Sequence, residues 1–259
     1  TIADWTWTTT GGWGQYFLYG DALAPGTSPS AAIVNGAPHV FFVDAAKGDT
    51  ITDWVWNPTG GWGQYFLHGD AAAPDTSPSV VQVGSTPNVF FVDAAKGETL
   101  TDWVWNSGTG WDQQFLYGDK VAPGTSPSAI AAEDQTHAFF VDVTRGNRLT
   151  DWNWSQGAGW HETRLGEGTE SEPTAAAEGT RPTSIVVNGA LDVFYGDASA
   201  GNAISEWSWH GGSSWEQFPF LGDEIAKGTH PSALIVNGTP NVFFVDAAKG
   251  DTIADWTWT

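Results

Sequence analysis

The sequence predicts an all-β fold, a β-propeller built from four-stranded blades. Three observations lead to this prediction. A repeat of about 49 residues runs through the 259-residue chain. Each repeat contains four short segments rich in β-branched and aromatic residues, and no segment carries a convincing helical period. A repeat of this length with four strands is typical of a propeller, in which each repeat forms one radial sheet.

The repeat is defined by three motifs that keep the same spacing. Asp/Glu-Trp-x-Trp places its first tryptophan at positions 5, 54, 103, 152, 207 and 256, so the steps are 49, 49, 49, 55 and 49 residues. A second motif, a tryptophan that follows a small residue, recurs at the same spacing. So does a third motif, aromatic-aromatic-x-Asp. Together they place a six-residue insertion between Trp160 and Asp197. We expect residues 167–183 to form a longer surface loop there.

One repeat illustrates the four predicted strands. They cover residues 79–83, 88–92, 99–105 and 113–117, and turn-forming residues separate them. The chain starts with the third and fourth strands of a blade and ends with the first, second and third strands of another. We therefore predict a single domain, residues 1–259, most simply with five blades. The fifth blade combines residues 1–28 with residues 229–259, a closure that removes exposed sheet edges.

The third strand is present twice in this arrangement. Residues 1–8 and residues 252–259 have the identical sequence TIADWTWT. One position in a blade cannot hold both copies. The second copy is displaced, pairs with another molecule, or reflects a longer array.

Composition excludes several classes of protein. The chain has no cysteine, which excludes disulfides, zinc–thiolate sites and a thiol nucleophile. No apolar run has the roughly 18–20 residues that a transmembrane helix needs. The net charge of −21 argues against nucleic acid as a partner. The six histidines follow no metal-ligand spacing, so neither a metal nor another cofactor is expected.

The repeat resembles that of the Aleuria-type fucose lectins, and more loosely that of the Photorhabdus-type propeller lectins. The segment that carries the resemblance is FVDAAKGETLTDWVW, residues 91–105, followed by Gly110-Trp111. The resemblance implies a propeller that binds monosaccharides between adjacent blades. Each pocket would use the acidic residue before Trp-x-Trp, the second Trp of that motif, the Trp after the Gly turn, and an Arg on the second strand.

The first three of these positions are filled in the repeats. The acidic residues are Asp4, Asp53, Asp102, Asp151, Glu206 and Asp255. The second tryptophans are Trp7, Trp56, Trp105, Trp154, Trp209 and Trp258, and the Gly-turn tryptophans are Trp13, Trp62, Trp111, Trp160 and Trp215. The arginine has no counterpart, because Arg145, Arg148, Arg164 and Arg181 all lie outside the second strands. This argues against specificity for fucose.

These residue types suit a sugar, although each has a structural alternative. An indole offers a broad platform to the C–H face of a pyranose, and a carboxylate accepts strong hydrogen bonds from hydroxyl groups. The acidic residue could equally accept hydrogen bonds from loop N–H groups. The first Trp of each motif is expected in the core, and the Asp that ends the second strand, such as Asp44, is expected to cap a turn.

Repetition of nearly the same residues in every blade favours a non-catalytic carbohydrate-binding lectin. We expect it to be secreted, extracellular or at the cell surface, and multivalent, with glycans as partners. One alternative is a structural or assembly propeller. It would exchange its duplicated strand with another copy and so form a homo-oligomer. A less favoured alternative is a glycoside hydrolase, for which Glu133, Asp134 and Glu162 are scattered candidates.

Overall fold

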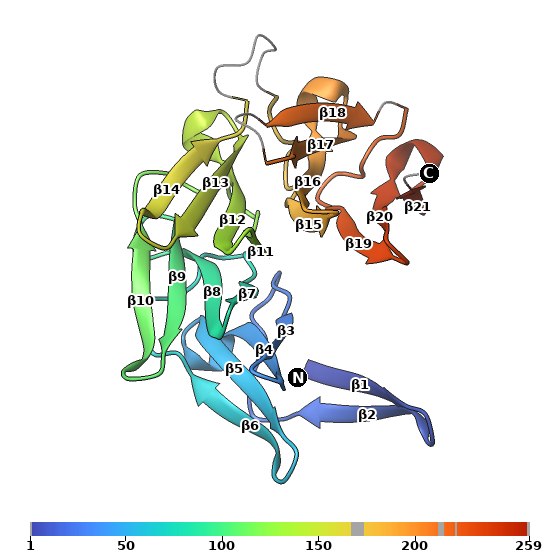
Figure 1. Cartoon of the computed structure of the whole chain (residues 1–259). Helices are drawn as coiled ribbons and strands as arrows, with labels where there is room; N and C mark the ends of the chain where they lie inside the picture. The colour runs from blue at the N-terminus through green and yellow to red at the C-terminus, as the bar shows by residue number, and fades with distance from the viewer. Residues whose placement is uncertain (1, 167–173, 212–214, 221, 258–259) are drawn as a thin grey trace.

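The structure is a computed structural model that describes residues 2–166, 174–211, 215–220 and 222–257. Within these residues the chain forms β-strands and four single-turn 3₁₀ helices, and it contains no α-helix. The strands form successive antiparallel sheets, which are arranged around an arc in Figure 1. The predicted fold class, an all-β propeller of four-stranded blades, is confirmed.

Four blades are complete four-stranded sheets. The first contains β3 (Ser30–Val34), β4 (Ala37–Asp44), β5 (Thr50–Asn57) and β6 (Gly61–Phe66). The second contains β7 (Ser79–Val83), β8 (Thr86–Asp93), β9 (Thr99–Asn106) and β10 (Gly110–Leu116). The third contains β11 (Ser128–Ala132), β12 (Gln135–Asp142), β13 (Arg148–Ser155) and β14 (Gly159–Arg164). The fourth contains β15 (Thr183–Val187), β16 (Ala190–Asp197), β17 (Ala203–Trp209) and β18 (Glu216–Phe220).

The strands assigned to the fifth blade lie at the two ends of the chain. A two-stranded sheet contains β1 (Ile2–Thr8) and β2 (Gly12–Leu18). A three-stranded sheet contains β19 (Ser232–Val236), β20 (Thr239–Asp246) and β21 (Thr252–Thr257). Figure 1 shows these two sheets, blue and red, as the separate ends of the arc.

This division differs from the predicted union of residues 1–28 and 229–259 in one sheet. The physical reason is the duplicated third strand. β2 already pairs with β1 through a short local hairpin, in the register Trp5↔Gln15. Its pairing edge is therefore occupied by the first copy of the sequence, and the second copy, β21, pairs with β20 alone.

Between the second and third strands of each complete blade, an aspartate organises the turn. The Asp44 side chain accepts a hydrogen bond from the backbone N–H of Ala46 at 2.9 Å, and Gly48 ends the turn with φ of 73°. A left-handed residue at this position is where glycine is favoured. The same side chain–backbone bond is made by Asp93, Asp142, Asp197 and Asp246. The predicted turn-capping role is confirmed.

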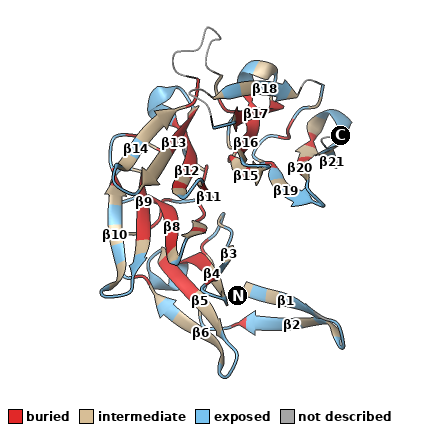
Figure 2. Cartoon of the chain, in the orientation of Figure 1, coloured by how far each residue is buried: buried red, intermediate tan, exposed pale blue. Residues whose placement is uncertain are grey.

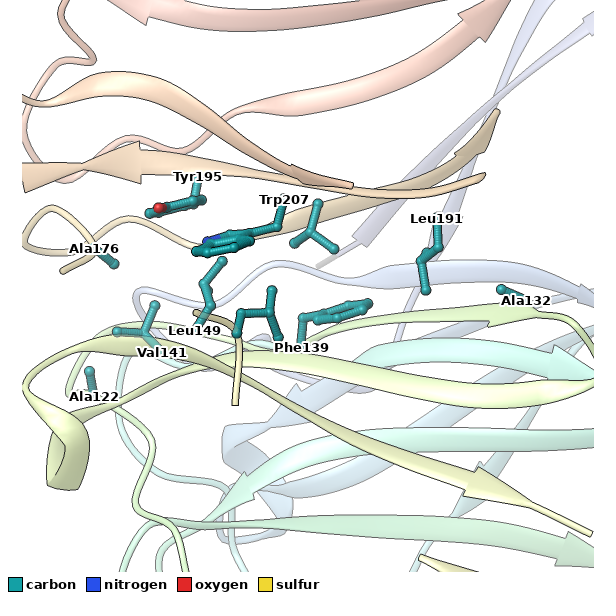
Figure 3. Close-up of a cluster of buried hydrophobic side chains, with 11 residues drawn as sticks. Ala122, Ala132, Phe139, Val141, Leu149, Ala176, Leu191, Tyr195 and Trp207 are labelled. Atoms are coloured by element: carbon teal, nitrogen blue, oxygen red, sulfur yellow. The ribbon is translucent and has the colours of Figure 1, made fainter. Parts of the chain in front are cut away.

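The hydrophobic core lies between blades rather than inside any one of them. Figure 3 shows one such layer, in which Phe139 and Leu149 of the third blade face Leu191 and Trp207 of the fourth. Equivalent clusters lie between the first and second, second and third, and fourth and last sheets. Figure 2 shows that burial is concentrated in the second and third strands of the middle blades and is low in β1 and β2.

The first strands of successive sheets contact one another along the inner side of the arc. Serine hydroxyls at the start of these strands accept hydrogen bonds from the next blade. The N–H of Val80 donates to the Ser30 hydroxyl, and that of Ala129 donates to the Ser79 hydroxyl. Arg181, just before β15, reaches across to Ser77 and to the carbonyl of Asp75, each at 3.0 Å. The inner side is therefore polar and cross-linked between non-adjacent blades.

Strand positions were predicted well from sequence. β7 matches the predicted range 79–83, and the other strands of that repeat extend the predicted ranges by one to three residues at some ends. The predicted insertion loop, residues 167–183, lies partly outside the described residues, and its described part begins at residue 174.

Candidate functional site

The acidic residue before Trp-x-Trp is buried in all four complete blades. Asp53, Asp102, Asp151 and Glu206 are at most 5% exposed. Alternation along the third strand turns this side chain away from the first Trp. In the two terminal sheets Asp4 is half-buried and Asp255 is exposed. A buried carboxylate needs partners, so the neighbouring side chains decide what it can do.

One such neighbour is a polar residue near the start of the second strand. In the first blade the Nδ1 atom of His39 lies 2.9 Å from Oδ2 of Asp53. In the third blade His137 Nδ1 lies 2.8 Å from Oδ2 of Asp151. The equivalent residues in the other sheets are Asn88, Asp192 and Asn241.

These second-strand residues were missed by sequence reasoning, which considered only the apolar run that begins one residue later. A signal was present in the sequence. In each repeat a polar residue precedes the acid by 14 positions, as His39 precedes Asp53. An antiparallel pairing with a short turn brings two residues at that spacing onto neighbouring strands.

The second Trp and the Gly-turn Trp of each repeat form an aromatic pair across a hairpin. Trp56 pairs with Trp62 in register, and their ring centroids are 5.6 Å apart in an edge-to-face arrangement. Trp105 and Trp111 repeat this geometry at 5.5 Å. The hairpin turn requires a left-handed residue just before the second ring, as at Gly110 with φ of 89°. Corresponding pairs are Trp7–Trp13, Trp154–Trp160 and Trp209–Trp215.

The Gly-turn Trp also packs on the preceding blade. Trp111 meets Phe41 of the first blade edge-to-face at 5.8 Å between ring centroids. Trp160 meets Phe90, and Trp215 meets Phe139, in the same way. This tryptophan therefore has a structural role at the blade interface. Trp13, whose β2 lies at the end of the arc, is 64% exposed.

The third and fourth blades enclose a cavity of about 150 Å³ that brings these features together. The third blade contributes Asp151, His137 and Asn153, and the fourth contributes Trp209 and Trp215. Asn153 donates to Asp151 at 3.2 Å and to the Thr163 hydroxyl at 3.0 Å. An acid of one blade thus faces the aromatic pair of the next blade.

A second cavity, of about 1110 Å³, lies between the fourth blade and the sheet β19–β21. Asp192, Glu206 and Ser208 line it from the fourth blade, and Val242 and Trp256 line it from the terminal sheet. Here the second-strand position holds an aspartate instead of a histidine. Burial, and after it the neighbouring Asp192, together raise the pKa of Glu206 to about 8.

The carboxyl groups in the first two blades also have raised pKa values. Burial raises the pKa of Asp53, and the hydrogen bond to His39 opposes that effect. Asp102 is completely buried, and burial raises its pKa well above the usual value. Carboxyl groups held in their neutral form act as hydrogen-bond donors as well as acceptors.

The remaining predicted residues are less directly associated with a cavity. The first tryptophans Trp103 and Trp207 are buried, as expected for core residues. The expectation is wrong for Trp5, which is 57% exposed because β1 has no blade packed on it, and the other first tryptophans, Trp54, Trp152 and Trp256, are half-buried. Trp258 lies outside the described residues. Of the hydrolase candidates, Glu133 lines the smaller cavity, whereas Glu162 pairs with Arg164. Asp134 lies in the adjacent turn with a positive φ of 61°.

The residues that the structure describes offer neither a metal centre nor a membrane-spanning helix. No group of three or more histidine, aspartate or glutamate side chains is placed to hold a metal ion. No helix there is long and apolar enough to cross a membrane.

Comparison with known proteins identifies the fold. No protein-family model and no curated protein matches the sequence. Solved propeller structures do match. The lectin BP39L from Burkholderia pseudomallei is 16% identical with a TM-score of 0.74, over 95% of this chain and 71% of that chain. AofleA from Arthrobotrys oligospora is 18% identical with a TM-score of 0.64, over 96% and 74%.

The Aleuria aurantia lectin, described as a six-bladed β-propeller with a novel mode of fucose recognition, is 14% identical with a TM-score of 0.57, over 89% and 74%. The structure is therefore similar to the Aleuria-type lectin propellers, as the repeat sequence indicated. At these identities the similarity establishes the fold.

Proposed function

We propose that this chain is a non-catalytic, carbohydrate-binding lectin with several similar sites, one at each interface between blades. The observation that carries the proposal is the cavity in which Asp151 and His137 face Trp209 and Trp215. The paired indoles provide an apolar platform, and the acid–histidine pair provides a hydrogen-bond acceptor and donor beside it. Similar lectin folds, including one solved with α-methyl fucoside, support the same assignment.

The chemistry of the proposed site is recognition rather than bond cleavage. Asp151 is held by His137 and Asn153, so its carboxylate is oriented to accept hydrogen bonds from hydroxyl groups. A second carboxylate in the same cavity, Glu133, is exposed and has no acidic equivalent in the first, second and fourth blades, where Asn35, Gly84 and Asn188 occupy the same position. Repetition of the aromatic pair, with an acid facing it, favours multivalent binding.

A glycan array tests the proposal directly. We expect wild-type protein to bind a subset of glycans, and fucose to compete weakly, since no arginine lies on the second strands. Combined replacement Trp56→Ala, Trp105→Ala, Trp154→Ala and Trp209→Ala should abolish binding. The matched control replaces two exposed aromatic residues outside both cavities, Tyr65→Ala and Tyr117→Ala. Absence of binding to every glycan would refute the proposal.

A second function, assembly by strand exchange, is favoured by the edge strand β21. The outer edge of β21 pairs with no strand among the described residues, and its sequence is that of β1. β2 of another molecule could therefore pair with β21 in the register that it uses with β1. Light scattering over a range of protein concentrations tests this function, and a monomer at every concentration would exclude it.

A further inference from the structure

The interface between the fourth blade and β19–β21 differs from the others in the charge of one residue. In the first and third blades a histidine faces the buried acid. In the fourth blade Asp192 takes that position beside Glu206, and both side chains are at least nine-tenths buried. A hydrogen-bond donor has thus been replaced by a second acceptor.

The donors that this carboxyl pair needs are only partly supplied by the protein. Ser208 donates to Oδ1 of Asp192. No protein donor among the described residues reaches the buried Oε2 atom of Glu206. A buried carboxylate oxygen without a donor is costly, so the site is suited to a ligand that brings positive charge and several N–H groups.

The walls of the cavity define the rest of the ligand. Phe194, Phe220 and Trp256 supply aromatic faces next to the carboxyl pair. Aromatic faces attract both the C–H surface of a sugar ring and a nearby cation. The cavity volume of about 1110 Å³ easily accommodates a monosaccharide. Among the described residues that line it there is no lysine or arginine, and His210 is the one basic side chain.

We propose that the pocket formed by Asp192, Glu206 and the aromatic wall binds an amino sugar through its protonated amine. The inference rests on the proposed lectin function and names the ligand class for one of its sites. The ammonium group donates to both carboxylates, and the sugar ring lies against the aromatic residues. The histidine-containing sites of the first and third blades bind neutral sugars instead.

The test compares four small molecules by titration calorimetry at pH 6: glucosamine, N-acetylglucosamine, glucose and cyclohexylamine. We expect glucosamine to bind at least about tenfold more tightly than the two neutral sugars, the scale of one charge-assisted hydrogen bond. Equal affinity for the three sugars would overturn the proposal. Equal affinity for cyclohexylamine would overturn the assignment to a sugar.

Proton release gives a second readout. Since the pKa of Glu206 is about 8, the carboxyl pair holds a proton at pH 6, and the ammonium group displaces it. The enthalpy measured in buffers of different ionisation enthalpy should therefore report release of about one proton per ligand. Within the part of the chain that the structure describes, Asp192 and His210 are the other titratable groups that line the cavity, and the strands β15, β18, β20 and β21 contribute uncharged residues. Absence of proton release would contradict displacement at this pair.

Two substitutions locate the site. Asp192→His recreates the pair of the first and third blades and should remove glucosamine binding, whereas Asp112→Asn, which removes one charge at an exposed position, should not. Conversely, His137→Asp builds a second carboxyl pair and should add a glucosamine site, a gain that misfolding cannot imitate. Failure of both variants to change amine binding would overturn the proposal. If the glycan array is positive while glucosamine binds no better than glucose, this inference fails and the lectin function stands.

Discussion

The residue that faces the buried acid differs from blade to blade. It is histidine in the first and third blades, asparagine in the second and aspartate in the fourth. A single side chain therefore decides whether the carboxylate meets a donor or a second acceptor. Sites with nearly identical aromatic residues can differ in ligand because of this one position.

Glu206 gives a prediction about stability and pH. Its pKa is about 8 in the folded chain and near 4.5 in the unfolded chain. Between these values the folded state holds the extra proton, so its stability falls as pH rises from about 4.5 to about 8. We expect the Tm of wild-type protein to fall between pH 5 and pH 9 by more than that of Glu206→Gln. If the Tm values of the two proteins fell by the same amount between pH 5 and pH 9, the assignment would be contradicted.

Sequence reasoning at this scale succeeded where a residue type has one dominant use. The turn-capping Asp44 and the buried Trp103 follow from local bonding and strand alternation. It could not assign the acid–histidine pair, because that contact joins two strands whose exact register the sequence leaves open. Nor could it find which blade supplies each half of the cavity, since Asp151 meets the tryptophans of the following repeat.

At the scale of the element, the turn between the second and third strands is the most regular part of each blade. Asp93 accepts hydrogen bonds from the N–H groups of Ala95 and Lys96 and from the Thr101 hydroxyl, at 2.9–3.1 Å. It is fully buried, so its loss leaves those donors without a partner. The element depends on this one carboxylate.

We therefore expect Asp93→Ala to lower the free energy of unfolding by about 2 kcal/mol or more, which combines a lost cap with unsatisfied donors. Denaturant titration followed by tryptophan fluorescence measures the effect. Asp112→Ala, an exposed aspartate in β10, serves as the control and should change stability by less than about 0.5 kcal/mol. Equal midpoints for the two variants would show that the cap contributes little.

At the scale of the whole molecule, each of the two end sheets lacks strands that the other contains. Within the described residues, the sheet β19–β21 has no fourth strand, and the sheet β1–β2 has no first or second strand. Three blade interfaces contain a phenylalanine–tryptophan contact, as between Phe139 and Trp215. At the fourth interface Phe194 lines the larger cavity, and the missing tryptophan corresponds by repeat to Trp13. The fifth blade predicted from sequence would place β2 beside β21 and bring Trp13 to that position, as Trp215 lies beside Phe139 at an interface that keeps a cavity.

Cysteine cross-linking tests this closure in a chain that has no cysteine of its own. Ala3 is the partner of Phe17 in the β1–β2 hairpin, and Ala254 is the same residue in the second copy of the strand. We expect Phe17→Cys with Ala254→Cys to oxidise to a disulfide-linked monomer if the ring closes. A disulfide-linked dimer would indicate exchange between molecules. Phe17→Cys with Ala3→Cys is the matched comparison, and a disulfide in that pair alone would mean that β2 stays with β1.

The placement of the core between blades has a consequence for unfolding. Each sheet is stabilised mainly by its immediate neighbours, so the molecule behaves as a row of coupled units. The third blade, covered on both sides by clusters of buried residues, has most to lose, and β1–β2 has least. Amide hydrogen exchange should therefore slow progressively from the hairpin at residues 2–18 toward β12 and β13. If the ring closes, the exchange rates of the slowest and the fastest strands should become similar, because a closed ring has no terminal sheet that can unfold first.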